Sequence, residues 1–183
     1  ALPGERVDGH DYINRALAAG AEAAVAEHDG DYTPAEKVLR VKSSLRALLE
    51  ISALYRAKMP AQVIGITGTK GKTTSALMTA HILNKSGIPA GYIGTSGINY
   101  AGRTYPTVNT TPESLELQRI MREMADSGIR AVVMEVSSQG LYLGRVRGID
   151  FDTVCFTNFS PDHIGGAEHP TLEHYAACKR KLF

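Results

Sequence analysis

Short, nearly continuous apolar runs alternate with segments of helical periodicity over most of this chain. The runs lie at residues 63–67, 90–94, 131–136 and 152–157 and predict buried strands. Helices are predicted over residues 73–85, from Thr111 as cap and Pro112 as first helical residue to about residue 128, and over 172–182. Residues 97–108 predict a hairpin that turns at Ala101-Gly102. This alternation predicts an α/β fold whose parallel sheet is covered by helices on both faces.

The first 59 residues show a smaller α/β pattern. A helix is predicted over residues 11–19, short strands over 23–25 and 38–41, and a second helix from Ser43 or Ser44. Lys58-Met59-Pro60 ends that helix, because a residue that precedes proline disfavours the helical conformation. We therefore predict a small α/β domain within residues 1–59 and a larger α/β domain within residues 60–183.

Length, charge and cysteine content limit the class of protein. At about 150 residues per domain the 183 residues correspond to ~1.2 domains, and both ends lack the usual start and stop signals, so we interpret the chain as a fragment. The net charge of +1 excludes a protein that binds nucleic acid by bulk charge. No apolar run approaches the ~18 residues of a membrane span, and two cysteines are too few for a disulfide framework. We expect a cytoplasmic monomer that binds neither nucleic acid nor membrane.

A glycine-rich segment between a predicted strand and a predicted helix has the pattern of a phosphate-binding loop. Its backbone N–H groups and the helix N-terminus favour phosphate, Lys72 reaches the outer phosphates, and the Thr73 hydroxyl suits Mg²⁺. Ile66 stands where the strict pattern has glycine, so we expect Gly68 to supply the early bend. The alternative is an ordinary turn with a surface lysine. The predicted ATP-binding residues are Gly68, Thr69, Lys70, Gly71, Lys72, Thr73 and Thr74.

Polar residues follow two of the predicted strands. Glu135 ends one apolar strand and is followed by Ser137-Ser138, and Asp162-His163 follow the next strand. The carboxyl ends of parallel strands form the ligand-binding edge of such sheets, which favours Glu135 as a Mg²⁺ ligand over a plain strand-end glutamate. By residue type, His163 is either a ligand at this edge or a structural histidine. Arg145 is interpreted as a clamp for a carboxylate or phosphate, or as a surface cation.

Zinc is not predicted from the cysteines, because Cys155, His163 and Cys178 have spacings unlike any common zinc motif. By residue type alone, Lys179 is one of three cations on the last helix, with Arg180 and Lys181.

Five stretches in this order together resemble the Mur ligase family of peptidoglycan synthesis. They are residues 8–13 (Asp-Gly-His-Asp-Tyr-Ile), 67–74, 109–113 (Asn-Thr-Thr-Pro-Glu), 135–138 (Glu-Val-Ser-Ser), and Thr157-Asn158 through Asp162-His163 to Lys179. The Leu-Gly-Arg-Val-Arg-Gly run at 143–148 is similar to the branch that adds the third residue to UDP-N-acetylmuramoyl-L-Ala-D-Glu. The resemblance implies the latter part of a UDP-substrate-binding domain (1–59) and the first part of a central ATP-binding domain (60–183).

The resemblance also implies an activity and its residues. The activity is ATP-dependent amide formation through an acyl phosphate, with meso-diaminopimelate or L-lysine as the added diamino acid. The implied cofactors are two Mg²⁺ ions and a CO₂-derived carbamate on Lys179, which turns a cation into an oxygen ligand. The implied catalytic residues are Lys72, Glu135, His163 and Lys179; the metal ligands are Thr73, Glu135, His163 and carbamylated Lys179; the contacts to the UDP-muramoyl dipeptide are Asn109, Thr110, Thr111, Ser137 and Arg145.

Some positions depart from the family pattern. Lys70 replaces an asparagine, Gln139 a histidine and Leu143 a polar residue, and the segment 164–170 is about two residues longer than usual. Two alternatives stay open: a ligase of the folylpolyglutamate or cyanophycin synthetase type with the same ATPase core, and a nucleotide-dependent switch without ligase chemistry. A GTPase is disfavoured, because Asn84-Lys85 is followed by Ser86-Gly87 rather than by the base-reading aspartate.

Overall fold

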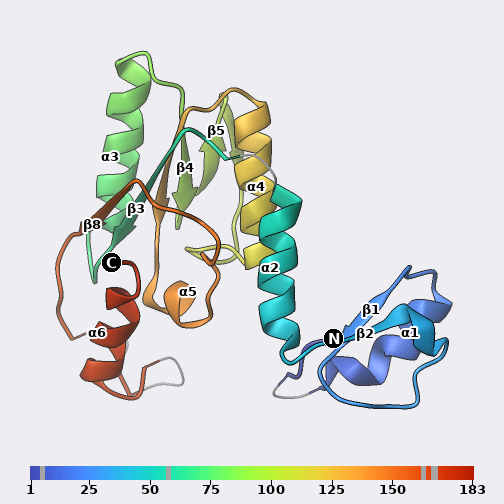
Figure 1. The fold of residues 1–183 in the computed structure, drawn as a ribbon. Coiled ribbons are helices and arrows are strands. Elements are labelled where there is room, and N and C mark those ends of the chain that lie inside the picture. Colours follow the sequence, from blue (N-terminus) through green and yellow to red (C-terminus); the bar gives the residue numbers. More distant parts are fainter. Residues whose placement is uncertain (5–6, 57–58, 162–163, 166–168) are drawn as a thin grey trace. The chain divides into compact units, whose positions relative to one another are not determined.

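The structure is a computed structural model that describes residues 1–4, 7–56, 59–161, 164–165 and 169–183 (Figure 1). The chain divides into two compact units, Ala1–Ile51 and Ser52–Phe183. The division falls within helix α2 (Ser44–Arg56), a few residues before the predicted domain boundary between residues 59 and 60. That boundary stays a prediction.

The first unit is a small α/β arrangement, as the sequence predicts. Its core consists of Ile13, Leu17 and Ala26, which bring helix α1 and strand β1 together. Strands β1 and β2 pair in parallel. The elements are the 3₁₀ helix η1 (Gly9–Tyr12), α1 (Ile13–Ala18), β1 (Ala24–Ala26), the 3₁₀ helix η2 (Ala35–Lys37) and β2 (Val38–Arg40).

The Asp-Gly-His-Asp stretch has a clear structural role in this unit. Asp8 caps η1 by accepting a hydrogen bond from the backbone N–H of His10 at 2.9 Å, and its carboxylate lies 2.6 Å from Nδ1 of the same residue. The other ring nitrogen of His10 accepts from the backbone N–H of Glu27 at 3.0 Å. Both nitrogens of the buried imidazole are therefore engaged in holding the start of the chain against the segment after β1.

The second unit is built on a six-stranded sheet with the order β6-β5-β4-β7-β3-β8. The four strands β4, β7, β3 and β8 run parallel, and β5 and β6 are antiparallel to their neighbours. The elements are β3 (Gln62–Thr67), α3 (Lys72–Lys85), β4 (Ala90–Gly94), β5 (Gly97–Tyr100), β6 (Arg103–Tyr105), α4 (Ser114–Asp126), β7 (Ala131–Glu135), α5 (Ser138–Tyr142), β8 (Thr153–Phe156) and α6 (Leu172–Arg180).

Alternate side chains of the central strand β7 enter two separate cores. Val132 and Met134 belong to a cluster that contains Met121 and Met124 of α4. Val133 belongs to the other cluster, with Ala76 and Ala80 of α3. Because successive residues of a strand point to opposite faces, α3 and α4 cover the two faces of the sheet. All five residues of β7 are buried, which explains why its sequence is a continuous apolar run rather than an alternating one. The predicted fold class is confirmed.

The predicted hairpin is also confirmed, and its turn has the conformation that the sequence requires. Strands β5 and β6 are antiparallel, with Tyr100 opposite Arg103. Between them Ala101 has φ 49° and Gly102 has φ 74°. Two successive positive φ angles define a type I′ turn, whose twist matches that of the flanking strands.

Candidate functional site

The phosphate loop connects β3 to α3 and is bent by two glycines. Gly68 has φ 142° and Gly71, the N-cap of α3, has φ 82°. A Cβ atom on Gly68 would lie 2.0 Å from the Thr157 hydroxyl oxygen, so the close approach excludes a side chain there. Lys72 donates from Nζ to the backbone carbonyls of Gly68 and Thr69, both at 3.0 Å, and thus lies folded over the loop.

A clamp from the end of β8 holds this loop in place. Asn158 accepts from the backbone N–H of Lys70 at 3.0 Å and donates from Nδ2 to the carbonyl of the same residue at 2.9 Å. The Thr157 hydroxyl donates to the Lys70 carbonyl at 2.7 Å. By sequence, these two residues belong to a stretch that resembles the family but are assigned no role. The residues that follow the neighbouring parallel strands β3 and β8 lie at the same edge of the sheet. This topology is the information from which the contact between Asn158 and the phosphate loop could be predicted.

Glu135 lies at the end of β7, fully buried, and is surrounded by hydrogen-bond donors. One carboxylate oxygen, Oε1, accepts from the Tyr92 hydroxyl at 2.6 Å and from the backbone N–H of Thr95 at 2.9 Å. The other, Oε2, accepts from the Thr73 hydroxyl of the first turn of α3 at 2.9 Å. The predicted Mg²⁺ ligands Thr73 and Glu135 are therefore brought together, although they are far apart in the sequence.

The backbone of β4 leaves just enough room for this carboxylate. A Cβ on Gly94 would come within 2.2 Å of Glu135 Oε1. Burial is the main cause that raises the pKa of Tyr92 to about 12, and the hydrogen bond to Glu135 adds to it. The Tyr92 phenol thus stays protonated and donates to the carboxylate. Neither Tyr92 nor Thr95 could be found from the sequence, since Tyr92 is a single hydroxyl in an apolar strand and Thr95 donates from its backbone N–H.

Thr111 links the segment before α4 to the end of β7. Its hydroxyl oxygen accepts from the backbone N–H of Ser137 at 2.9 Å and lies 3.1 Å from the Glu135 carbonyl. The prediction that Thr111 caps a helix is wrong, because α4 begins at Ser114 with Glu113 as its N-cap. The Thr111 hydroxyl accepts from the distant Ser137 instead of capping the helix.

Arg145 lies beside Thr111, and two of its three guanidinium nitrogens have partners among the described residues. Its side chain is buried at 6% exposure. Nη1 donates to the Thr111 carbonyl at 3.2 Å and Nη2 pairs with the Glu113 carboxylate at 2.5 Å. The buried Nε atom finds no hydrogen-bond partner among the described residues. Asn109 Nδ2 also reaches Glu113, at 3.4 Å.

Lys179 is buried, at 1% exposure, whereas the neighbouring Arg180 and Lys181 are exposed. Its Nζ donates to the carbonyl of Gly68 at 2.8 Å and lies 4.4 Å from the centre of the Tyr175 ring. Lys179 is thus set apart from the other two cations at the end of this chain by its burial against the phosphate loop. His163, the other predicted ligand of a second metal ion, lies outside the described residues.

One cavity of about 270 Å³ is lined by seven of the fifteen predicted site residues. Lys72 and Lys179 lie on the side of the phosphate loop, and polar residues from the segments after β6 and β7 complete the wall. The lining residues are Thr69, Lys72, Val108, Asn109, Thr110, Ser137, Ser138, Gln139, Arg145, Tyr175 and Lys179. Thr73, Thr111 and Glu135 are connected to this wall by the hydrogen bonds described above. A cavity lined by cations, amides and hydroxyls suits an anionic, polar ligand.

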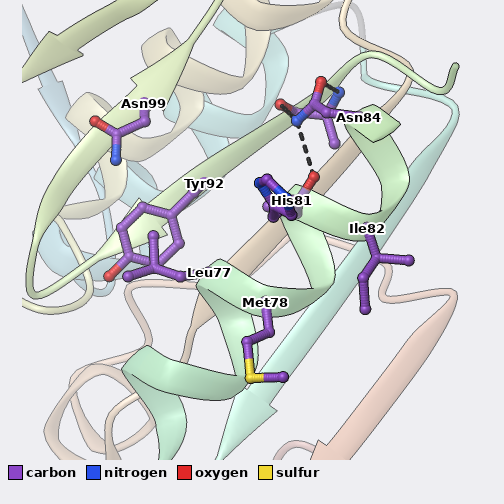
Figure 2. Close-up of a pocket in the computed structure, with 9 residues that line it drawn as sticks. Leu77, Met78, His81, Ile82, Asn84, Tyr92 and Asn99 are labelled. Carbon is purple, nitrogen blue, oxygen red and sulfur yellow. Dashed lines mark hydrogen bonds between the residues drawn. The ribbon is translucent and has the colours of Figure 1, made fainter. Parts of the chain in front are cut away.

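A larger cavity of about 500 Å³ lies beside α3 and has little chemistry to offer (Figure 2). Leu77, Met78 and Ile82 contribute apolar side chains. The amide of Asn84 bonds the backbone of Ala80 and Ala90. The polar cavity at the phosphate loop is therefore the candidate site. Among the described residues, no helix combines the length and the apolar character that crossing a membrane requires.

A phosphate loop that follows a central parallel strand, with a buried carboxylate at the end of the neighbouring strand, defines a P-loop α/β domain. Residues 66–183 match the family model described as the Mur ligase middle domain, and residues 1–57 match the one described as Mur ligase family, catalytic domain. The chain belongs to the Mur ligase family, which confirms the predicted resemblance.

Curated relatives match over the whole chain. It is 44% identical to the UDP-N-acetylmuramoyl-L-alanyl-D-glutamate--2,6-diaminopimelate ligase of Geobacillus kaustophilus, covering 100% of this chain and 37% of the relative. The ligase of the same name from Chlorobaculum tepidum is 42% identical, with 100% and 36% covered. The chain thus spans little more than a third of the length of these relatives.

Solved structures of the family share the fold. A UDP-N-acetylmuramoyl-L-alanyl-D-glutamate--2,6-diaminopimelate ligase superposes with a TM-score of 0.81 at 30% identity, over 94% of this chain and 34% of that one. The MurF ligase of Thermotoga maritima in complex with ADP gives a TM-score of 0.62 at 23% identity, over 100% and 38%. At that identity the second likeness concerns the fold alone.

Proposed function

We propose that this chain forms the ATP-binding part, and a portion of the UDP-substrate-binding part, of a ligase of peptidoglycan precursor synthesis. The ligase adds a diamino acid to UDP-N-acetylmuramoyl-L-Ala-D-Glu. The observation that carries the proposal is the single polar cavity in which Lys72 of the phosphate loop faces Asn109, Ser137 and Arg145. A nucleotide and an anionic peptide need such a juxtaposition, because the phosphoryl group must pass directly from one to the other.

The proposed reaction has two steps. A carboxylate of the peptide attacks the γ-phosphate of ATP, which gives an acyl phosphate and ADP; the amine of the diamino acid then displaces phosphate and forms the amide bond. Lys72 would leave the carbonyls of Gly68 and Thr69 and bind the outer phosphates, while Arg145 would hold a carboxylate through its fork of donors. The work of these residues is positioning and charge stabilisation.

The oxygen atoms of Glu135 and Thr73 form a set of ligands that fits a Mg²⁺ ion. Glu135 and Thr73 offer hard oxygen atoms that already lie 2.9 Å apart, and hard cations of this kind prefer oxygen ligands. When bound, Mg²⁺ would neutralise part of the repulsion between the phosphates and the attacking carboxylate. A second Mg²⁺ held by His163 and Lys179 stays a prediction.

The burial of Lys179 supports the proposal that its carbamate would serve that second ion. Its Nζ is buried and shares the Gly68 carbonyl with the ammonium group of Lys72. Carbamylation by CO₂ consumes a neutral amine and yields an anionic oxygen ligand, which suits a cation far better than a lysine ammonium does. The buried position would also shield the carbamate from bulk water.

Amino-acid-dependent ADP release tests the activity. The intact protein would receive ATP, the UDP-muramoyl dipeptide and a panel of amino acids. We expect release with a diamino acid, and the names of the relatives favour 2,6-diaminopimelate over L-lysine. No release with any member would overturn the proposal. Release with a folate substrate instead would favour a folylpolyglutamate-type ligase, and a preference for GTP over ATP would favour a nucleotide switch.

A pair of arginine variants tests the substrate side. Arg145→Lys keeps the charge but removes the planar fork, so we expect the KM for the UDP-muramoyl dipeptide to rise by about tenfold or more. Arg147→Lys is the matched control, since Arg147 belongs to the same run but is exposed. Equal effects of the two substitutions would remove Arg145 from the site. The cytoplasmic location and the monomeric state also belong to this proposal.

A further inference from the structure

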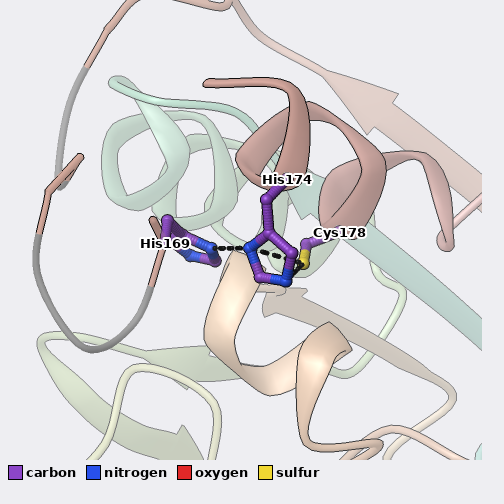
Figure 3. Close-up of side chains that lie close together, drawn as sticks. All are labelled: His169, His174 and Cys178. Atoms are coloured by element: carbon purple, nitrogen blue, oxygen red, sulfur yellow. Dashed lines mark hydrogen bonds between the residues drawn. The ribbon is translucent and has the colours of Figure 1, made fainter. Parts of the chain in front are cut away.

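Two histidines and a cysteine form a cluster beside the cavity, and the proposed ligase reaction uses none of them (Figure 3). His174 and Cys178 lie one turn apart on α6, and His169 comes from the segment before this helix. Their nitrogen and sulfur atoms all lie within 4.8 Å of one another. Residues four positions apart share a helix face, so both side chains of α6 point to the same place, where Figure 3 shows His169 meeting them.

We propose that His169, His174 and Cys178 bind a divalent transition-metal ion of the zinc class. In a tetrahedral zinc site, with Zn–N of about 2.05 Å and Zn–S of about 2.3 Å, two nitrogen ligands lie about 3.3 Å apart and a nitrogen and a sulfur about 3.6 Å apart. Here the Nδ1 atoms of the two histidines are 3.1 Å apart, and Nδ1 of His174 is 3.9 Å from Cys178 Sγ. These two distances therefore need shifts of only a few tenths of an ångström, and the ligand atoms of His169 and Cys178 lie within 4.8 Å of each other.

The contact between His169 and Ser138 supports the same metal site. Coordination through Nδ1 requires the ring proton on Nε2, and Ser138 Oγ lies 2.8 Å from that atom to accept it. A hydrogen bond from the second ring nitrogen is the usual way in which a protein orients a histidine ligand. His169 is fully buried and His174 half-buried, so the site has a preformed inner wall and an open side for a water molecule as fourth ligand.

The chemistry separates this site from the proposed magnesium site. Imidazole and thiolate select zinc and related metals, whereas the oxygens of Glu135 and Thr73 select Mg²⁺. Bound metal would tie α6 to the segment at His169 and, through Ser138, to α5. Cys155, considered with Cys178 from the sequence, is exposed on β8 and takes no part.

The other candidate cluster is held together by bonds that a metal ion would have to replace. Asp8, His10 and His28 also lie close together, but both ring nitrogens of His10 already bond the Asp8 carboxylate and the backbone of Glu27. A metal ion there would break two bonds that hold the first unit together.

Cobalt titration of the intact, metal-free protein tests the proposal. Co²⁺ should produce a thiolate-to-cobalt charge-transfer band and the visible bands of a tetrahedral site, and equimolar Zn²⁺ should abolish them. Cys178→Ser, which exchanges one atom, should lose the charge-transfer band, and His174→Gln should lose the tight binding. Ser138→Ala should weaken Co²⁺ binding by about 10- to 100-fold, as expected for an outer partner of a histidine ligand.

The exposed cysteine provides the matched control, because Cys155→Ser should leave the bands unchanged. Absence of a charge-transfer band in the wild type would overturn the proposal, as would its persistence in Cys178→Ser or its equal loss in Cys155→Ser. Circular dichroism of each variant verifies folding, and His174→Gln decides the matter if Cys178→Ser does not fold, since His174 is only half-buried. The outcome is independent of whether the protein is a ligase.

Discussion

The Gly68→Ala substitution tests the close contact between the phosphate loop and the clamp after β8. Gly68 has φ 142°, and residues other than glycine pay about 1–3 kcal/mol to adopt such sparsely populated backbone conformations. The new Cβ would also lie 2.0 Å from Thr157 Oγ1 and 3.1 Å from the backbone of Asn158. Displacement of the Thr157 hydroxyl from the Lys70 carbonyl would cost about 1 kcal/mol more. We therefore expect a total loss of about 2–4 kcal/mol.

Urea unfolding measures this loss, and Gly87→Ala is its matched control. Gly87 follows α3 with φ 78° but has open space around its Cα, so its substitution should cost only the backbone strain, about 1–2 kcal/mol. Thr157→Ala should cost less in the Gly68→Ala background than in the wild type, because it removes the clashing atom. A Gly68→Ala variant no less stable than Gly87→Ala, or strict additivity with Thr157→Ala, would refute this reasoning.

Three further predictions follow from individual contacts. Lys72→Ala in the intact protein should abolish ATP binding measured by calorimetry, and an unchanged affinity would remove the phosphate-loop assignment. Tyr92→Phe deletes a buried donor to a carboxylate and should cost about 1.5–3 kcal/mol in urea unfolding, whereas Tyr100→Phe, whose hydroxyl lies 3.2 Å from Glu123 nearer the surface, should cost about 1 kcal/mol or less. The Tyr92 pKa is raised from the ordinary 10.0 to about 12, so the stability that the Tyr92 phenol contributes should persist below pH 10 and disappear as the pH rises towards 12. A titration followed by phenol absorbance that shows no late ionisation would contradict this. Hydrogen bonds from His10 lower the Asp8 pKa from 3.8 to about 2, so this group should stabilise the fold above pH 4 and cease to do so as the pH falls towards 2. Acid unfolding of Asp8→Asn should lose that part of the pH dependence, and a curve parallel to the wild type would contradict it.

Local signals were sufficient for the secondary structure around the phosphate loop. The strand predicted over residues 63–67 is Gln62–Thr67, and the helix predicted over 73–85 is Lys72–Lys85. Glycines on either side of the helix and Pro89 beyond it carry this information within a few residues. The hairpin turn at Ala101-Gly102 was predictable for the same reason, because its positive φ angles depend on the local sequence.

Tertiary contacts overruled the local signals elsewhere. Thr111 has the residue type and the following proline of a helix cap, yet its hydroxyl bonds Ser137 after a distant strand. Lys179 sits among charged residues, yet it is buried against a loop 111 positions away. Neither arrangement leaves a mark in the neighbouring sequence, since both depend on which strands lie side by side.

The candidate site was predicted as a set of residue types but not as an arrangement. The resemblance named Glu135, Lys72 and Arg145, and the structure brings them to one edge of the sheet. The resemblance could not reveal that Tyr92 donates to Glu135 or that His169 lies close to Cys178. His174 and Cys178 are separated by four residues on one helix, which is a readable spacing, but their partner His169 depends on the path of the chain before α6.

The Gly68 carbonyl makes one oxygen atom the meeting point of two cations. Lys72 reaches it at 3.0 Å and Lys179 at 2.8 Å, so the two ammonium groups can be no farther apart than these lengths together. At such a separation each group senses the charge of the other strongly, because the Lys179 side chain is buried and the attenuation by water is reduced. A change of sign on Lys179 would turn repulsion into attraction and would hold the Lys72 ammonium more firmly beside the Gly68 carbonyl. The charge on Lys179 of the last helix would therefore act directly on the position of the Lys72 ammonium group at the phosphate loop.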